Sequence, residues 1–104
     1  MKKLLPIVMA STFALAACGP STERLVNDGN EAFYNQDFQG ALTAYQQAQA
    51  DSPELAEPHY NAANTHYHQE NYEQALEEIE QTLVKDQGDL AQASLYNLGN
   101  TFFQ

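Results

Sequence analysis

The chain has 104 residues, of which 17% are charged: 4 Lys and Arg stand against 14 Asp and Glu, and the formal net charge is −10. A chain of this length forms one small domain at most. Its acidic surface repels the phosphates of nucleic acids and anionic lipid headgroups, so we expect neither as a partner, and it attracts basic proteins or divalent cations weakly.

The first 17 residues have the three parts of a secretory signal. Residues 1–3 are Met-Lys-Lys, residues 4–17 are apolar and small, and this stretch is too short to span a bilayer as a helix. It ends in Leu-Ala-Ala-Cys at residues 15–18, which resembles the lipobox of bacterial lipoproteins. The resemblance implies cleavage after Ala17, acyl chains such as palmitate on Cys18, and attachment to a membrane. The alternatives are an ordinary signal peptide with a chance cysteine and an uncleaved anchor.

Lipidation would place the protein in the cell envelope. Cleavage after residue 17 would remove two lysines and leave Arg24 and Lys85 against all 14 acidic residues, a net charge of −12. Gly19 follows the cysteine, whereas lipoproteins kept at the inner membrane carry mainly aspartate there. The resemblance therefore favours the outer membrane, facing the periplasm, in a cell with two membranes. Residues 18–22 form a short linker, whose last four residues span about 13 Å when fully extended.

Residues 23–104 predict helices in antiparallel pairs. The clearest pair runs from His59 to Val84, where apolar residues recur at helical spacing on both sides of a polar turn at residues 69–71. Residue types that cap or end helices stand at the expected boundaries. They are Ser21 or Thr22 before the first helix, Asp37 and Asn71 before the second helix of each pair, Gln74 in a capping box with Asn71, and Gly88 at a left-handed end of the fourth helix.

The predicted helix pairs repeat along the chain. Residues 38–48 align with residues 72–82 at an offset of 34. A third, partial copy at residues 95–103 aligns with residues 59–67 at an offset of 36. One such pair cannot bury its own apolar face in water, so the copies must stack on each other.

A helical hairpin that recurs every 34 residues, with small residues at fixed positions, resembles the tetratricopeptide repeat (TPR) family. The residues that carry the resemblance are Gly29, Ala41, Tyr45, Ala48 and Pro53 in the first copy, Tyr67, Ala75 and Ile79 in the second, and Leu98, Gly99 and Phe102 in the third. It implies an all-α solenoid of stacked antiparallel helix pairs, with two full repeats at about 22–55 and 56–89 and the first helix of a third at 92–104. Ala63, Thr82 and Gln87 depart from the family pattern, which has glycine, alanine and proline there.

The third copy stops inside its first helix. Its apolar residues Leu95, Leu98, Phe102 and Phe103 have no following helix to cover them. A solenoid normally ends in a helix with a polar outer face. We therefore expect the chain to be the N-terminal part of a longer protein. The alternatives are a fifth helix that itself caps two full repeats, and self-association through this C-terminal edge.

The sequence offers little for catalysis or cofactor binding. No serine or threonine sits in a nucleophile elbow, no glycine-rich loop precedes a helix, and the single cysteine is assigned to lipid. His59 and His66 share a helix face, and with Glu70 they would make only a weak metal site. We expect no enzymatic activity, no metal, no cofactor and no small-molecule substrate.

Asparagines recur at two positions of each repeat, three residues apart. They are Asn27 and Asn30, Asn61 and Asn64, and Asn97 and Asn100. The TPR resemblance places this strip on the concave surface. Because an amide both donates and accepts, an asparagine ladder can pair with the main chain of an extended peptide; it can also bond neighbouring helices, and both roles can coexist. Four tyrosines, Tyr34, Tyr60, Tyr67 and Tyr96, would add flat contacts or pack between repeats. The strip carries no Lys or Arg, which speaks against a clamp for a C-terminal carboxylate.

These features lead to one functional hypothesis and one rival. The hypothesis is a membrane-anchored TPR scaffold that binds a protein or peptide segment in its concave groove and helps a cell-envelope complex to assemble. The rival is the N-terminal interaction part of a longer envelope protein that carries an enzymatic or von Willebrand-type module.

Overall fold

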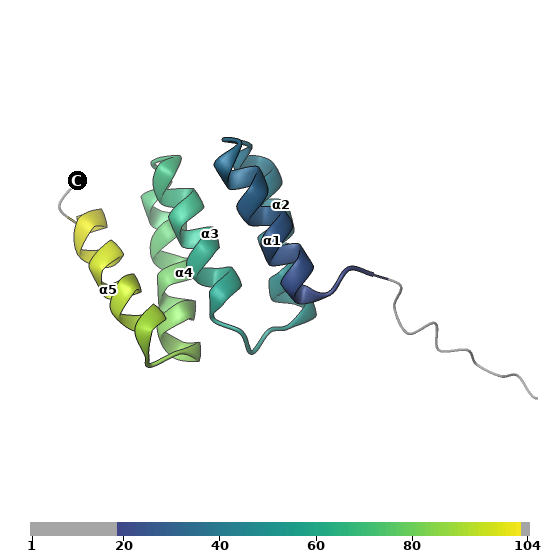
Figure 1. Ribbon diagram of the computed structural model, residues 1–104. Helices are drawn as coiled ribbons and strands as arrows, with labels where there is room; N and C mark the ends of the chain where they lie inside the picture. Colours follow the sequence, from purple (N-terminus) through teal and green to yellow (C-terminus); the bar gives the residue numbers. More distant parts are fainter. Residues whose placement is uncertain (1–18, 103–104) are drawn as a thin grey trace, which may run out of the picture.

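The computed structural model describes residues 19–102, with side chains up to Asn100. Five helices and no strand make up this part of the chain (Figure 1): α1 Thr22–Tyr34, α2 Phe38–Asp51, α3 Glu57–His68, α4 Tyr72–Lys85 and α5 Asp89–Phe102. Within the described residues, no helix has the length and apolar character needed to cross a membrane. Cys18, the lipobox before it and Phe103 lie outside the described residues, as does the side chain of Phe102.

The helices form two antiparallel pairs followed by a fifth helix (Figure 1). α1 packs against α2, and α3 packs against α4. The pairs stack because α2 also contacts α3 and α4 contacts α5. α1 contacts α3, and α3 contacts α5, so these three helices line one side of the array. The predicted all-α solenoid of stacked helix pairs is confirmed.

Two helices begin with the caps predicted from the sequence. Ser21 Oγ accepts a hydrogen bond from the Arg24 N–H at 3.2 Å, and Asp37 Oδ1 accepts one from the Gly40 N–H at 3.0 Å, so both side chains cap helices as predicted.

The turns within both pairs share their backbone geometry. Residues 36 and 70, which lie 34 positions apart, both adopt a φ of 60° although they are glutamine and glutamate. Such left-handed residues are uncommon outside glycine. The two repeats therefore share a left-handed backbone conformation that glutamine and glutamate, as residue types, do not predict.

The start of α4 differs from the prediction. Asn71 precedes the helix, but its side chain makes no capping bond. Its Nδ2 instead donates to Gln69 Oε1 at 3.5 Å, within the turn. The capping box with Gln74 is therefore wrong.

The boundary between α4 and α5 also differs from the prediction. Gly88 is not left-handed, since no glycine in residues 19–102 has a positive φ. α4 ends one residue before Asp86, whose extended backbone leaves the helix. The Asp86 carboxylate accepts hydrogen bonds from the N–H groups of Gly88, Leu90 and Ala91, at 3.2, 3.1 and 3.3 Å. This acceptor fixes the start of α5, so a flexible residue is not needed to end α4.

Each helix pair closes around one matched pair of residues. In the first pair, the buried ring of Tyr45 lies over Gly29, and a Cβ atom on Gly29 would be 2.5 Å from Tyr45 Cε1. In the second pair, the equivalent positions hold Ala63 and Ile79, both buried. Isoleucine is smaller than tyrosine, so the larger residue at position 63 is matched by a smaller one at position 79. The departure of Ala63 from the glycine of the family pattern is thus compensated within its own hairpin.

Candidate functional site

α1 and α3 each present one stripe of side chains along the groove between them. The stripe on α1 comprises residues 23, 27, 30 and 34, and the stripe on α3 comprises residues 57, 61 and 64. Spacings of three and four residues place these side chains on one face of each helix. Two hollows open along the stripes, with volumes of about 260 and 360 Å³.

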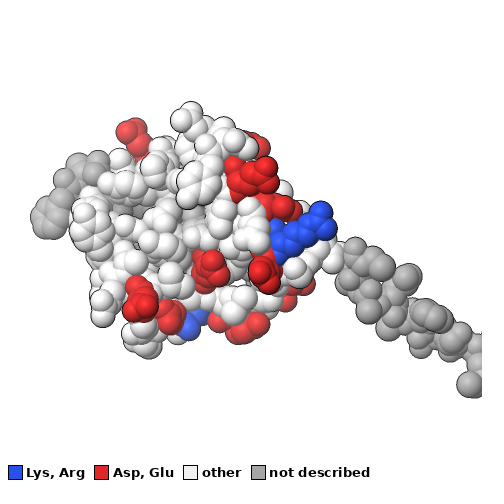
Figure 2. All heavy atoms as spheres, viewed as in Figure 1, with Lys and Arg blue, Asp and Glu red and all other residues white. Residues whose placement is uncertain are grey.

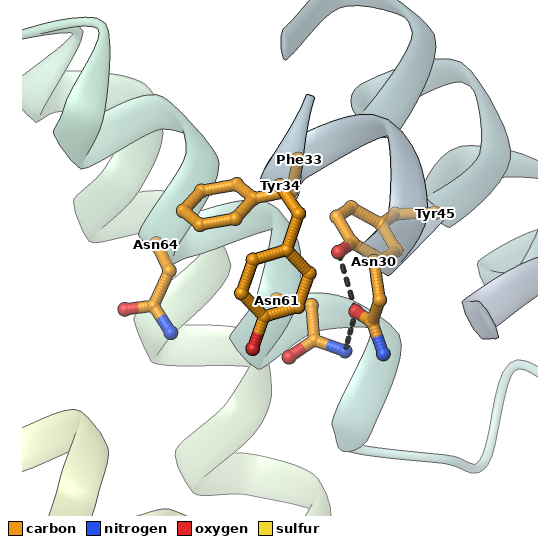
Figure 3. A pocket seen from close by; sticks show the side chains of 6 residues that line it. All are labelled: Asn30, Phe33, Tyr34, Tyr45, Asn61 and Asn64. Atoms are coloured by element: carbon orange, nitrogen blue, oxygen red, sulfur yellow. Dashed lines mark hydrogen bonds between the residues drawn. The ribbon is translucent and has the colours of Figure 1, made fainter. Parts of the chain in front are cut away.

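The two hollows differ in the chemistry of their walls. The first, which we call the amide hollow, is lined by Asn30, Phe33, Tyr34, Tyr45, Asn61 and Asn64 (Figure 3). The second, which we call the acidic hollow, is lined by Thr22, Glu23, Val26, Asn27, Leu55 and Glu57. The acidic hollow lies at the N-terminal ends of α1 and α3, and the amide hollow lies further along both helices.

A hydrogen-bonded amide network forms the wall of the amide hollow. The Tyr45 hydroxyl donates to Asn30 Oδ1 at 2.6 Å, and Asn61 Nδ2 donates to the same oxygen at 3.4 Å (Figure 3). Asn97 Nδ2 on α5 donates to Asn64 Oδ1 at 2.6 Å. The asparagines therefore join α1, α2, α3 and α5, which is the structural role left open by the sequence. These contacts use the side-chain oxygens of Asn30 and Asn64 and not their amide N–H groups.

Tyr45 is the closer of the two donors to Asn30 Oδ1. Burial raises the pKa of Tyr45 to about 12, and the negative charge of Glu57 adds to the shift. The hydroxyl consequently keeps its proton at every physiological pH. Asn30 Oδ1 is held as an acceptor, and the orientation of its amide is fixed.

The residues predicted for the groove are distributed over both hollows and their surroundings. Asn30, Asn61 and Asn64 line the amide hollow, and Asn27 lines the acidic hollow. Asn97 and Asn100 lie half-buried on α5. Tyr60 is half-buried on α3 and lines neither hollow. Tyr67 also lines neither; its ring packs edge-on against Tyr72, with 5.6 Å between ring centroids.

Some lining residues were not singled out from the sequence as members of the groove. No sequence signal singles out Phe33 for the groove, Tyr45 is identified only as a residue of the family pattern, and Leu55 lies in the connection between the pairs. The sequence does contain a signal for Glu23 and Glu57: they lie 34 residues apart, so two acidic residues occupy the same position of both repeats. Tyr34, by contrast, is one of the tyrosines proposed for the groove from the sequence; it lines the amide hollow, is 84% exposed, and continues the α1 stripe at the spacing of the asparagines.

A second polar network joins three helices through Glu78. His59 Nδ1 lies 2.6 Å from Glu78 Oε2, and Gln49 Nε2 donates to the same oxygen at 3.1 Å. These residues come from α3, α4 and α2, respectively, and the side chains of His59 and Glu78 are largely buried. Glu78 therefore fastens the second helix pair to the first. Among residues 19–102 no three His, Cys, Asp or Glu side chains gather as metal ligands would.

Negative charge dominates the surface of the described residues. All 14 acidic residues lie within residues 19–102, where the only basic residues are Arg24 and Lys85. In this part of the chain, neither Arg24 nor Lys85 forms an ion pair with a carboxylate, and the one histidine–carboxylate contact joins His59 and Glu78. Figure 2 shows acidic side chains spread across the face with α1 and α3 in front, and basic atoms only towards the amino-terminal end and at the lower edge. A negatively charged partner would meet repulsion over this face.

Comparison with known protein families gives two overlapping matches. Residues 27–89 and residues 60–104 each match the tetratricopeptide repeat family. Together the matches run from α1 to the end of the chain and include both helix pairs and α5.

Proposed function

Because the chain belongs to the tetratricopeptide repeat family, we propose that it is a scaffold that binds an extended segment of another protein in the groove between α1 and α3. Repeats of this family mediate contacts between proteins, and they are in general not enzymes. A linear segment fits a groove made of two parallel stripes better than a compact small molecule does.

The amide hollow is the observation that carries this proposal. Asn30 and Asn64 use their oxygens for contacts inside the protein, through Tyr45, Asn61 and Asn97. Their N–H groups are the complement of main-chain carbonyl oxygens, which an extended segment presents at regular spacing. The ring of Tyr34 stands beside these amides in the same hollow (Figure 3), where it offers a flat apolar face to the side chains of the segment.

Substitution of Asn64 tests the proposed contact. Peptides of 12 residues would be selected from a random display library on the chain carrying Cys18→Ser, which cannot be lipidated. Asn64→Ala should raise the Kd of the selected peptides about tenfold, as expected for the loss of one hydrogen bond in a binding site. Asn71→Ala, in the exposed turn before α4, is the matched control and should leave the Kd unchanged. Equal Kd values for Asn64→Ala and the unsubstituted chain, measured by fluorescence anisotropy, contradict the proposal.

Membrane attachment is the second part of the proposal. The basic start, the apolar stretch and Leu-Ala-Ala-Cys at residues 15–18 support lipid on Cys18. Gly19 supports the outer membrane, with the scaffold facing the periplasm and helping an envelope complex to assemble. Cys18→Ala should move the protein from the membrane fraction to the soluble fraction of lysed cells. A variant that stays in the membrane fraction counts against lipidation.

A further inference from the structure

We infer that the segment bound in this groove carries a lysine or arginine in the acidic hollow and an apolar or aromatic side chain in the amide hollow. This inference rests on the proposed function, since it specifies the ligand of the same groove. It follows from the shapes and charges of the two hollows and from the distance between them.

The acidic hollow combines an aliphatic wall with two carboxylates. Leu55 is 41% exposed there and adjoins Val26, whereas Glu23 and Glu57 face the hollow from equivalent positions of the two repeats. Neither glutamate forms an ion pair with another described residue. A lysine or arginine side chain has an apolar stem and a cationic tip, so it matches both parts of this wall. A purely apolar side chain matches only the aliphatic part of the wall, and an acidic side chain matches neither part.

The charges around the acidic hollow add to this preference. The Thr22 hydroxyl, at the edge of the hollow, hydrogen-bonds to the Asp51 carboxylate, which brings a third negative charge close by. The N-termini of α1 and α3 each contribute about half a positive charge, which offsets only part of the three carboxylates. Among the residues that line either hollow there is no lysine or arginine. The net field at the hollow is therefore negative.

The amide hollow, which lies further along the groove, favours a different kind of side chain. The exposed ring of Tyr34 and the half-buried ring of Phe33 form its apolar part, and three asparagines form its polar part. An apolar side chain covers the rings while its main chain meets the amides. The centres of the two hollows are about seven residues apart along α1, or roughly 10 Å. A segment in the polyproline II conformation has three residues per turn and rises about 3.1 Å per residue, so side chains three positions apart lie on one side of it and about 9 Å from each other. We therefore place the basic and apolar side chains at positions i and i+3 or in the reverse order.

Two synthetic peptides that differ only in charge test the inference. One carries Lys-Ser-Ser-Phe and the reverse Phe-Ser-Ser-Lys in tandem, and the other carries norleucine in place of each lysine, which keeps the stem and removes the charge. Both are titrated into the chain carrying Cys18→Ser, labelled with ¹⁵N. The lysine peptide should shift the amide signals of residues along both hollows. The norleucine peptide should bind more weakly and shift mainly those along the amide hollow.

Charge-neutralising variants locate the effect. Glu23→Gln with Glu57→Gln should raise the Kd of the lysine peptide roughly threefold to tenfold, as expected for the loss of two exposed ion pairs, and leave the norleucine peptide unchanged. Glu73→Gln with Glu80→Gln, on the exposed side of α4, changes the net charge equally and should affect neither peptide. If both double variants weaken the lysine peptide alike, or if neither does, the inference is wrong.

The two proposals fail in distinguishable ways. Asn64→Ala should weaken both peptides, because both use the amide hollow. If Asn64→Ala weakens binding but the lysine and norleucine peptides bind equally, the groove binds segments without the basic preference, and only the inference falls. If neither peptide shifts the signals of the groove residues, the inference falls together with the proposed groove.

Discussion

The ring of Tyr45 lies so close to Gly29 that this position of α1 has no room for a methyl group. A Cβ atom there would be 2.5 Å from Cε1 and 2.7 Å from Cδ1 of the ring. The same ring supplies the hydroxyl that holds Asn30. One residue thus connects the packing of the first helix pair with the orientation of an amide in the groove.

Gly29→Ala should lower the free energy of unfolding by about 1–3 kcal/mol, because overpacking forces the Tyr45 ring out of place. Gly99→Ala is the matched control, since Gly99 is also helical but has no atom within 4 Å of an added Cβ. There the better helix propensity of alanine should raise stability by up to about 1 kcal/mol. Urea unfolding measures both values, and a Gly29→Ala chain as stable as the Gly99→Ala chain would contradict the packing argument.

His66 gives the protein a pH dependence of known sign. Its Nδ1 is buried without a hydrogen-bond partner, and burial lowers the pKa of His66 although Glu78 and Glu77 pull the other way. Because the unfolded chain takes up the proton first as pH falls below about 6.5, folding loses stability there, and it has its full value above that pH. The free energy of unfolding should therefore fall between pH 7 and pH 5, and fall less in His66→Gln. Equal losses in both chains would show that another group titrates.

At the scale of helices, the 34-residue repeat predicts the helix positions more accurately than the residue types predict the helix caps. The 34-residue offset locates both helix pairs, and Asp37 caps α2 as expected. Asn71 at the equivalent position bonds within its turn instead, and Asp86 displaces Gly88 as the residue that sets the end of α4. In the first case a neighbouring side chain, Gln69, accepts from the Asn71 amide, and in the second a carboxylate accepts from the N–H groups at the start of α5. Residue types alone predict neither contact.

The sequence predicts which residues line the groove better than it predicts how their side chains are oriented. Periodicity places the asparagines on one strip, and the strip does face the hollows at Asn27, Asn30, Asn61 and Asn64. The direction of each amide, however, depends on how neighbouring helices are rotated, and this is set by packing contacts such as Tyr45 on Gly29. The contribution of Leu55 depends on the path of the connection between the helix pairs.

Glu78 should be the carboxylate of α4 that matters most for stability. It holds His59 and Gln49 from two other helices, so its removal leaves two partly buried polar side chains without their acceptor. Glu78→Ala should lower the free energy of unfolding by about 1–2 kcal/mol. Glu80→Ala, two residues along and exposed, should change it by less than about 0.5 kcal/mol. Chemical denaturation separates the two, and similar losses would mean that helix propensity, not the network, is responsible.

At the scale of the whole molecule, like charges repel one another across the surface. The chain carries a formal net charge of −10, and no Lys or Arg of its described residues forms an ion pair with a carboxylate. Raising the salt concentration shortens the screening length from about 30 Å at 0.01 M to about 8 Å at 0.15 M, which weakens this repulsion. The melting temperature should therefore rise between these salt concentrations. A melting temperature that falls would show that attractive charge pairs outweigh the repulsion.

The matched pairs Gly29 with Tyr45 and Ala63 with Ile79 also bear on how such a chain can grow and recombine. If α3 were copied into the place of α1, Ala63 would bring its methyl group against the ring of Tyr45. A copied hairpin would carry Ala63 together with Ile79, and the fit inside it would be preserved. For this contact, a whole hairpin keeps its internal fit when it is copied, whereas a single helix does not. The helix pair is therefore the smallest segment that can be duplicated without a clash at these positions.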